Sequence, residues 1–205
     1  MKTFIQVDNK RRLKDLVLQF GKVIKDNSNH KKIVLHLSGG LDTRSIFSVL
    51  LNLNKDFCCV VSDFNTTYTS DINIAKRLSK DYCKKLIFHK FKKQDIFING
   101  FFELCNYTKD FDIVFSGLMM TEYLNRFQPK ARYCFKKYQD DTLLYLHTPI
   151  YSIVPSNVFL PILDYELLRQ LRYLYKGFQK NSIIQKAIIN YYYPELLDYS
   201  YRSEL

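Results

Sequence analysis

Residues 33–44 read Ile33-Val34-Leu35-His36-Leu37-Ser38-Gly39-Gly40-Leu41-Asp42-Thr43-Arg44, and this stretch decides the fold. The mainly apolar residues at its start predict a buried strand, and the apolar positions from Ile46 to Leu50 predict a helix after the turn. The first amides of such a helix point at the Ser/Gly turn, and the helix dipole favours negative charge there. Two consecutive glycines let the backbone come close to phosphate oxygens. The stretch therefore predicts a strand, a loop and a helix that together bind phosphate.

Asp42 narrows the kind of ligand that this loop would accept. A carboxylate repels phosphate unless a divalent cation lies between them, so the motif indicates a polyphosphate bound to Mg²⁺. The loop is not a Walker A loop, because no Gly-Lys-Ser/Thr sequence follows the glycines. A simple turn with Asp42 as a helix N-cap is the alternative for the Gly-Gly pair alone. The strand before it and the helix after it favour the phosphate site.

The first half of the chain alternates between apolar strands and helices. An opening helix is expected with Asp8 as its cap, and later helices are expected at 43–53, from the cap Ser70 onward, and at about 95–105. Strands are expected at 33–37, 57–62, 86–89 and 113–115. This order predicts an α/β fold, a parallel twisted sheet with helices on both faces. Ligands bind beyond the carboxyl ends of such strands, where Ser38-Gly39-Gly40 and Ser116-Gly117 both lie.

The second half has a different character. From Met119 onward the sequence is rich in aromatic residues and lysine and shows no convincing strand. Asp164 is expected to cap a helix, and residues 182–192 are expected to form the last long one. We therefore expect a single domain over 1–205, with an α/β nucleotide-binding core at about 1–118 and a helical lobe at about 119–205.

The loop at 38–44 resembles the pyrophosphate-binding loop of the asparagine synthetase family, whose pattern is Ser-Gly-Gly-Leu-Asp-Ser before a helix. Segments 64–78, 158–164 and 186–194 are similar to later parts of the synthetase domain of that family, a member of the PP-loop ATP pyrophosphatase superfamily. The resemblance implies an adenine nucleotide α-hydrolase-like, Rossmann-like fold with ATP and Mg²⁺ as cofactors. It also implies cleavage of ATP to AMP and pyrophosphate, which adenylates a carboxylate, such as aspartate or a related acid, for attack by ammonia or an amine.

The resemblance assigns roles to individual residues. The nucleotide-binding residues that it implies are Leu37, Ser38, Gly39, Gly40, Leu41, Asp42, Thr43, Val61, Ser116 and Gly117. The metal ligands that it implies are Asp42 and Glu122, and the catalytic candidates are Asp42, Arg44 and Lys186. Arg44 would bind a phosphate or the substrate carboxylate, while Lys186 or Arg202 would neutralise the departing pyrophosphate. A solvated or ion-paired surface role is the alternative for these three cations.

The chain departs from the family pattern after the fourth strand. Where the family has Ser-Gly-Glu-Gly-Ala-Asp-Glu, residues 116–122 carry Leu118 in place of the first glutamate and Thr121 in place of the aspartate. A candidate proton acceptor and a metal ligand are thereby lost, although Glu122 remains either as a ligand or as an acid favoured by a helix dipole. Three functions stay open: an amide-forming ligase, a tRNA-modifying sulfur or amine transferase of the same superfamily, and a non-catalytic domain that binds a nucleotide or a partner protein.

Composition sets the remaining expectations. The net charge of the 205 residues is +11, but the basic residues are spread along the chain, which favours a solvated surface over a nucleic-acid site. Five cysteines without a Cys-x-x-Cys pair suggest reduced thiols, and no signal peptide or membrane span is evident, so a cytoplasmic location without a membrane partner is expected. No glutamine-hydrolysing domain is recognised. We therefore expect nitrogen from ammonia, from an amine or from a separate amidotransferase partner.

Overall fold

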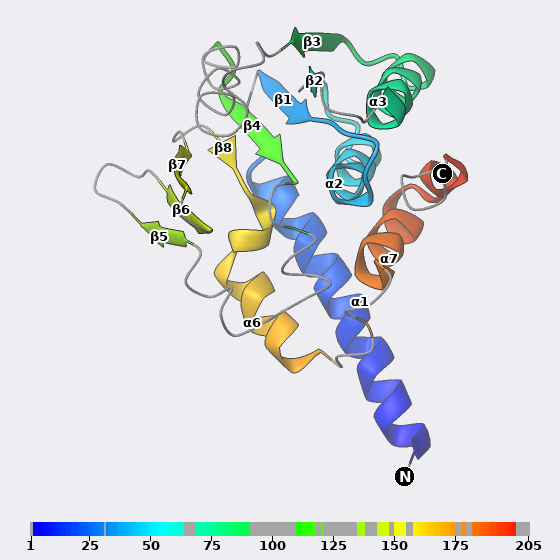
Figure 1. Ribbon diagram of the computed structural model, residues 1–205. Helices are drawn as coiled ribbons and strands as arrows, with labels where there is room; N and C mark the ends of the chain where they lie inside the picture. Colours follow the sequence, from blue (N-terminus) through cyan, green and yellow to red (C-terminus); the bar gives the residue numbers. More distant parts are fainter. Residues whose placement is uncertain are drawn as a thin grey trace.

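A five-stranded parallel sheet forms the centre of the protein, which is described here from a computed structural model (Figure 1). The structure describes residues 2–30, 32–63, 69–90, 110–117, 120, 135–137, 143–147, 150–154, 158–174, 178 and 182–199. The strands of the central sheet are β1 (Ile33–His36), β2 (Cys58–Asp63), β3 (Leu86–Lys90), β4 (Ile113–Ser116) and β8 (Val158–Phe159). Their order is β3-β2-β1-β4-β8, and every neighbouring pair is parallel. The predicted α/β fold is thus confirmed, and the four predicted strands differ from the observed ones by one residue at most at each end.

Helices from both ends of the chain pack beside this sheet. They are α1 (Lys2–Asp26), α2 (Leu41–Asn52), α3 (Thr69–Asp81), α6 (Tyr165–Tyr173) and α7 (Ile183–Tyr192), with the 3-10 segments η2 (Pro161–Leu163) and η4 (Pro194–Asp198). The long helix α1 runs past α2, α6 and α7, so the first and last helices lie side by side (Figure 1). None of the helices that the structure describes is long and apolar enough to cross a membrane.

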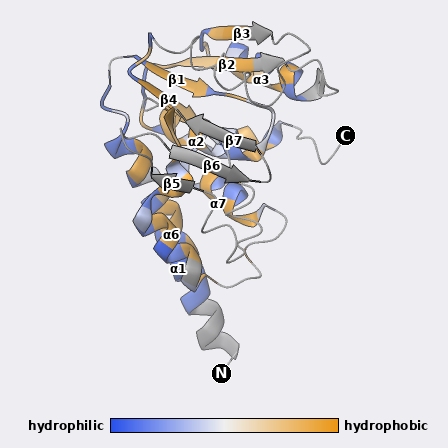
Figure 2. Cartoon of the chain, turned by 60° about the vertical axis from the view of Figure 1, so that its left-hand side comes forward, coloured by the Kyte–Doolittle hydropathy of each residue, from blue (hydrophilic) through white to orange (hydrophobic). Residues whose placement is uncertain are grey.

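Both faces of the sheet are buried at its central strands β1 and β4, because residues there alternate between two apolar clusters. Ile33 and Leu35 of β1 join the larger cluster, which includes side chains of α1, α2, α3 and α7. Val34 of the same strand joins Val60 and Val114 in the smaller cluster on the opposite face. Strands with two buried faces are mainly apolar, as the orange colouring of β1 and β4 in Figure 2 shows.

The register of the strands brings their carboxyl ends to one edge. His36, the last residue of β1, pairs with Val60 of β2 and with Ser116 of β4. The chain that leaves β1 at Leu37 therefore emerges beside the chain that leaves β4 at Gly117. This edge is where the phosphate loop was expected.

Two predicted helix caps are wrong. Helix α1 begins at Lys2, so Asp8 lies inside it and forms an ion pair with Arg12 at 2.9 Å. Ser70 lies in the first turn of α3, which begins at Thr69. Cap residue types also occur inside helices when their side chains find other partners, and the sequence alone does not separate the two cases. The helix expected at 95–105 lies outside the described residues.

The expectation that no strand follows Met119 is also wrong. Strands β5 (Phe135–Lys137), β6 (Leu143–His147) and β7 (Ile150–Val154) form an antiparallel sheet, while β8 joins β4 in the central sheet. β8 has two residues, too few for any periodic pattern. Helices α6 and α7 do occur in this half, as expected.

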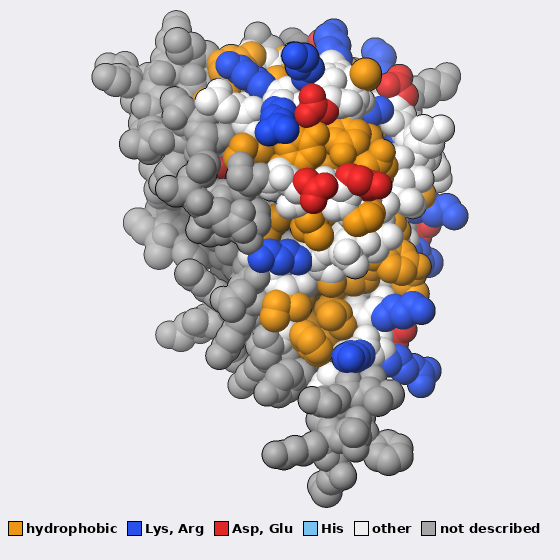
Figure 3. Space-filling view, turned by 90° about the vertical axis from the view of Figure 1, so that its right-hand side faces the viewer, with side chains coloured by type: hydrophobic (Ala, Val, Ile, Leu, Met, Phe, Trp, Pro, Cys, Tyr) orange, Lys and Arg blue, Asp and Glu red, His pale blue; other side chains and the backbone are white. Residues whose placement is uncertain are grey.

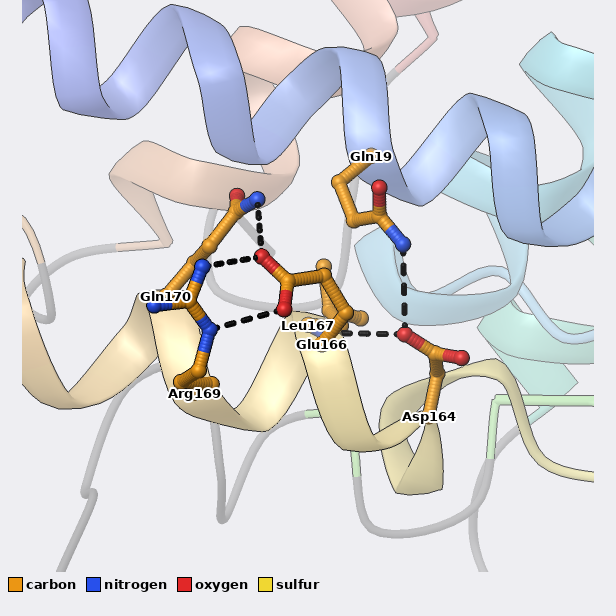
Figure 4. A network of polar contacts seen from close by, with 6 residues as sticks. All are labelled: Gln19, Asp164, Glu166, Leu167, Arg169 and Gln170. Carbon is orange, nitrogen blue, oxygen red and sulfur yellow. Dashed lines mark hydrogen bonds and ion pairs between the residues drawn. The ribbon is translucent and has the colours of Figure 1, made fainter.

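The predicted cap of α6 is confirmed, and it also joins α6 to α1 (Figure 4). Asp164 Oδ1 accepts a hydrogen bond from the Leu167 amide at 2.9 Å and one from Gln19 Nε2 of α1 at 3.3 Å. One carboxylate therefore fixes both the start of the helix and its position against its neighbour.

A candidate phosphate-binding site

The loop between β1 and α2 is closed by hydrogen bonds from its own side chains. Leu37 donates its amide to the Val60 carbonyl at 2.8 Å, which is the loop's link to β2. Thr43 Oγ1, in the first turn of α2, accepts from the Ser38 amide at 3.0 Å and lies 3.1 Å from Ser38 Oγ. Ser38 Oγ in turn accepts from the Gly40 amide at 3.2 Å. Ser38 and Thr43 thus hold the loop in a compact turn above the end of the strand.

The N-terminus of α2 faces this turn. Gly40 is the N-cap, with φ −73° and ψ 160°, and no side-chain hydrogen bond caps the helix there. The helix is 12 residues long, so its dipole and first-turn amides offer a favourable site for an anion. Leu41 is buried at this end, and it anchors the first turn in the core.

Glycine is needed at two positions because other elements come very close. A Cβ atom on Gly39 would lie 2.8 Å from Asp71 Oδ1 and 2.9 Å from Asp71 Cα, so α3 approaches the loop here. A Cβ atom on Gly117 would lie 2.9 Å from Thr43 Cγ2 and 3.0 Å from the Thr43 amide nitrogen. Gly40 is different, since its Cβ atom would meet only Ser38 Oγ, at 3.3 Å. The structure thus brings the loop, α2 and Ser116-Gly117 together. Among the described residues, only Ser38 approaches the side of Gly40 on which a Cβ atom would lie.

Asp42 lies in the first turn of α2 and is held from a distant part of the chain. Its Oδ1 atom accepts a hydrogen bond from Gln185 Nε2 of α7 at 2.9 Å. Gln185 is 1% exposed, and helix α7 packs along α2. Gln185 was not predicted as a site residue, although a glutamine among apolar residues of a buried helix is a signal that such a residue has a polar partner.

Arg44 is fully buried and binds backbone carbonyls. Its Nη2 donates to the Gly39 carbonyl at 2.6 Å, and its Nη1 donates to the carbonyls of Leu196 at 3.2 Å and Tyr199 at 2.8 Å. The guanidinium therefore connects the loop to the η4 segment. Arg44 has no exposed surface, and these hydrogen bonds give it a bracing position between the loop and η4. Its contact with a phosphate or a substrate carboxylate stays a prediction.

Asp71 is a second carboxylate beside the loop, and it was not among the predicted site residues. It lies in the first turn of α3. Burial raises the pKa of its carboxyl, while the positive charge of Arg44 acts in the opposite direction. Its Oδ1 atom is buried and has no hydrogen-bond partner among the described residues.

The other predicted site residues have varied positions. Val61 is 2% exposed, with its side chain in the larger cluster, so it would offer a ligand only its backbone. Lys186 follows Gln185 on α7 and is partly exposed. Glu122 and Arg202 lie outside the described residues, as do Leu118 and Thr121.

The described residues could hold Mg²⁺ only together with phosphate oxygens. They contain no group of three or more His, Cys, Asp or Glu side chains that could hold a metal ion. Mg²⁺ is commonly held by one or two carboxylates together with phosphate oxygens and water. Asp42, a carboxylate at the helix terminus that faces the loop, suits that role.

Comparison with solved structures gives distant likenesses, two of which are synthetases. No protein-family model and no curated protein matches the chain. An NMN synthetase from Francisella tularensis is 15% identical, with 86% of this chain and 73% of that chain covered and a TM-score of 0.44. An NH3-dependent NAD synthetase from Campylobacter jejuni is 16% identical, with 85% and 77% covered and a TM-score of 0.42. Likenesses at this level do not identify a family for the chain.

Proposed function

We propose that this protein is an ATP-dependent ligase that forms AMP and pyrophosphate. One observation carries the proposal: the Ser38–Gly40 loop, the start of α2 and Gly117 pack against one another at the carboxyl edge of a parallel sheet. That arrangement gathers backbone donors for phosphate and, in Asp42, a carboxylate for a cation. Ligand sites of open α/β sheets lie at this edge.

In this proposal the loop binds the β- and γ-phosphates of ATP. The backbone near Val61 and at Ser116-Gly117 borders the adenine. Asp42, with Glu122 as a second candidate, would hold Mg²⁺, which neutralises charge on the phosphate oxygens when it is bound. Gln185 keeps the Asp42 carboxylate in one orientation, as the 2.9 Å hydrogen bond supports.

The reaction proceeds in two steps. The substrate carboxylate attacks the α-phosphorus of ATP, the bond between the α- and β-phosphates breaks, and pyrophosphate leaves. Ammonia or an amine then attacks the carbonyl carbon of the acyl-adenylate, AMP leaves with the bridging oxygen, and the nitrogen loses a proton. Lys186 is the candidate that neutralises the departing pyrophosphate, because it follows Gln185 on the helix that contacts Asp42. Arg44 acts as a positioning residue for the loop.

The substrates and setting of this reaction follow the family resemblance. We propose a small carboxylic acid such as aspartate, and nitrogen supplied as ammonia, as an amine or by a separate amidotransferase. The chain acts as one domain, with a nucleotide-binding core at about 1–118, and works in the cytoplasm.

A nucleotide-binding domain without ligase activity is the alternative, and Leu118 and Thr121 favour it because they replace two carboxylates of the family pattern. A tRNA-modifying function has less support. On the face shown in Figure 3, the basic side chains are scattered among acidic and apolar ones and form no continuous basic surface.

Exchange of labelled pyrophosphate into ATP tests the proposal. The purified protein is incubated with ATP, Mg²⁺ and each member of a panel of amino acids and other small carboxylates. Exchange that depends on one carboxylate, followed by AMP release when ammonia or an amine is added, is the expected result. ATP binding by calorimetry without exchange on any carboxylate would contradict the ligase and support the non-catalytic alternative.

A further inference from the structure

The phosphate loop has a carboxylate on each of two sides. Asp42 belongs to α2 and is directed to Gln185 of α7. Asp71 belongs to α3, and its Oδ1 would be 2.8 Å from a Cβ atom on Gly39, so it lies against the loop backbone itself. The two residues are far apart in sequence, and the fold brings both to the loop that we propose to hold pyrophosphate.

Asp71 is partly buried as a whole residue, and one of its carboxylate oxygens is fully buried. The Oδ1 atom is buried against the loop, and no described residue donates a hydrogen bond to it. The positive charge that acts on it is that of Arg44, whose Nη atoms donate to the carbonyls of Gly39, Leu196 and Tyr199. A buried carboxylate oxygen without a donor costs free energy, and such groups in native proteins commonly serve an ion or a ligand.

A negative charge at this position determines which form of a polyphosphate the loop accepts. A free pyrophosphate anion in the loop would be repelled by Asp71 as well as by Asp42, whereas a divalent cation between phosphate and carboxylate turns that repulsion into attraction. We propose that Asp71 is a specificity-determining residue, which makes the loop select a polyphosphate bound to its divalent cation over the free anion. This inference rests on the proposed function, because that function puts pyrophosphate in the loop.

Calorimetry with inorganic pyrophosphate tests the role of Asp71 without turnover. The full chain is titrated once with excess Mg²⁺ and once with EDTA. The wild-type protein should bind pyrophosphate roughly tenfold or more tightly with Mg²⁺. Asp71→Asn keeps the shape and removes the charge, so binding in EDTA should strengthen by about tenfold, while binding with Mg²⁺ should weaken because the attraction between the carboxylate and the cation is lost.

Asp56→Asn is the matched control. Asp56 is exposed and precedes β2, at the opposite end of the strands from the loop, and its replacement changes the net charge equally. It should leave both affinities unchanged. Asp71→Ser, a smaller neutral replacement, repeats the test if the asparagine variant does not fold, as judged by thermal unfolding.

The possible outcomes separate this inference from the proposed function. A neutral Asp71 variant that keeps the wild-type preference for Mg²⁺, or that weakens binding equally in both conditions, would overturn the specificity role and leave the phosphate site intact. A wild-type protein that binds pyrophosphate equally well in both conditions would do the same. No binding by the wild type in either condition would overturn the phosphate site, and the inference with it.

Discussion

At the scale of single residues, the two glycines of the loop have different roles. Gly39 is required by the fold, since a Cβ atom there would lie only 2.8 Å from Asp71 Oδ1 and 2.9 Å from Asp71 Cα. Gly40 has an extended backbone with a negative φ, and a Cβ atom there would meet only Ser38 Oγ, at 3.3 Å, so a small shift of that hydroxyl would let the chain accept alanine. The close approach of a ligand is the remaining reason for Gly40.

We therefore predict opposite results for two alanine substitutions. Gly39→Ala should lower the free energy of unfolding by about 1–3 kcal/mol, because the methyl group overlaps the backbone of α3. Gly40→Ala should change it by less than about 0.5 kcal/mol and yet weaken pyrophosphate binding, because the methyl group faces the bound anion. Urea unfolding and calorimetry on both variants measure the two effects. An equal loss of unfolding free energy in the two variants would contradict the different roles of Gly39 and Gly40.

Asp42→Asn separates metal binding from folding. The asparagine carbonyl oxygen still accepts the hydrogen bond from Gln185, so the contact between α2 and α7 should remain. An amide oxygen is a much weaker ligand for Mg²⁺ than a carboxylate, so AMP production should fall by roughly a hundredfold or more. Nucleotide binding in EDTA should strengthen, because the Asp42 carboxylate no longer repels the free anion. Wild-type production of AMP and pyrophosphate by this variant would show that Asp42 is not the metal ligand.

At the scale of elements, the sequence predicted those whose pattern is local. The apolar run before Ser38 and the helical spacing after it fix β1 and α2 without help from the rest of the chain, and Asp164 caps α6 as expected. β8 was missed because its strand character comes from pairing with β4, not from its own two residues. Asp71 and Gln185 were missed for the same reason, since each meets the loop only through tertiary packing.

Arg44 acts between elements, and its replacement should be severe. Arg44→Leu leaves the carbonyls of Gly39, Leu196 and Tyr199 without their donors. We predict a loss of about 3 kcal/mol or more in the free energy of unfolding, because each buried carbonyl without a partner carries its own penalty. Arg44→Lys should recover little, since one ammonium group does not reproduce the planar fork. A loss below about 1 kcal/mol in urea unfolding would contradict this bracing role.

The contact between α1 and α7 predicts a change of stability at alkaline pH. Tyr192 of α7 packs on Gly21 and donates its hydroxyl to the Val17 carbonyl, and burial raises its pKa to about 12. The ordinary pKa of tyrosine is about 10. Since the folded state holds this proton more tightly, its contribution is complete below about pH 10 and is lost as the pH rises towards 12. Tyr192→Phe should flatten the fall in Tm over that range, and an unchanged slope would contradict the assignment.

At the scale of the whole molecule, Arg44 connects the first strand–loop–helix unit to a segment near the end of the chain. The connection predicts that a ligand bound in the loop also reduces the backbone motion of η4, because the carbonyls of Gly39, Leu196 and Tyr199 share one guanidinium. Hydrogen exchange followed by mass spectrometry, with and without pyrophosphate and Mg²⁺, measures this effect. Protection should rise in the loop peptides around 38–43 and also in peptides covering 194–199. Peptides of α6, which packs on α1 and η2, should not change.

Arg44→Lys is the control for this coupling, since it keeps the charge and removes the fork that joins the two segments. In a folded Arg44→Lys protein that still binds pyrophosphate, the loop should gain protection while 194–199 does not. Equal protection of η4 in both proteins would mean that the signal travels through the packing of α7 on α2 and not through Arg44. A shared buried donor couples its acceptors only when ligand binding changes their positions or their motion. Protection of the loop alone in the wild type would therefore show that the two segments held by the guanidinium respond independently.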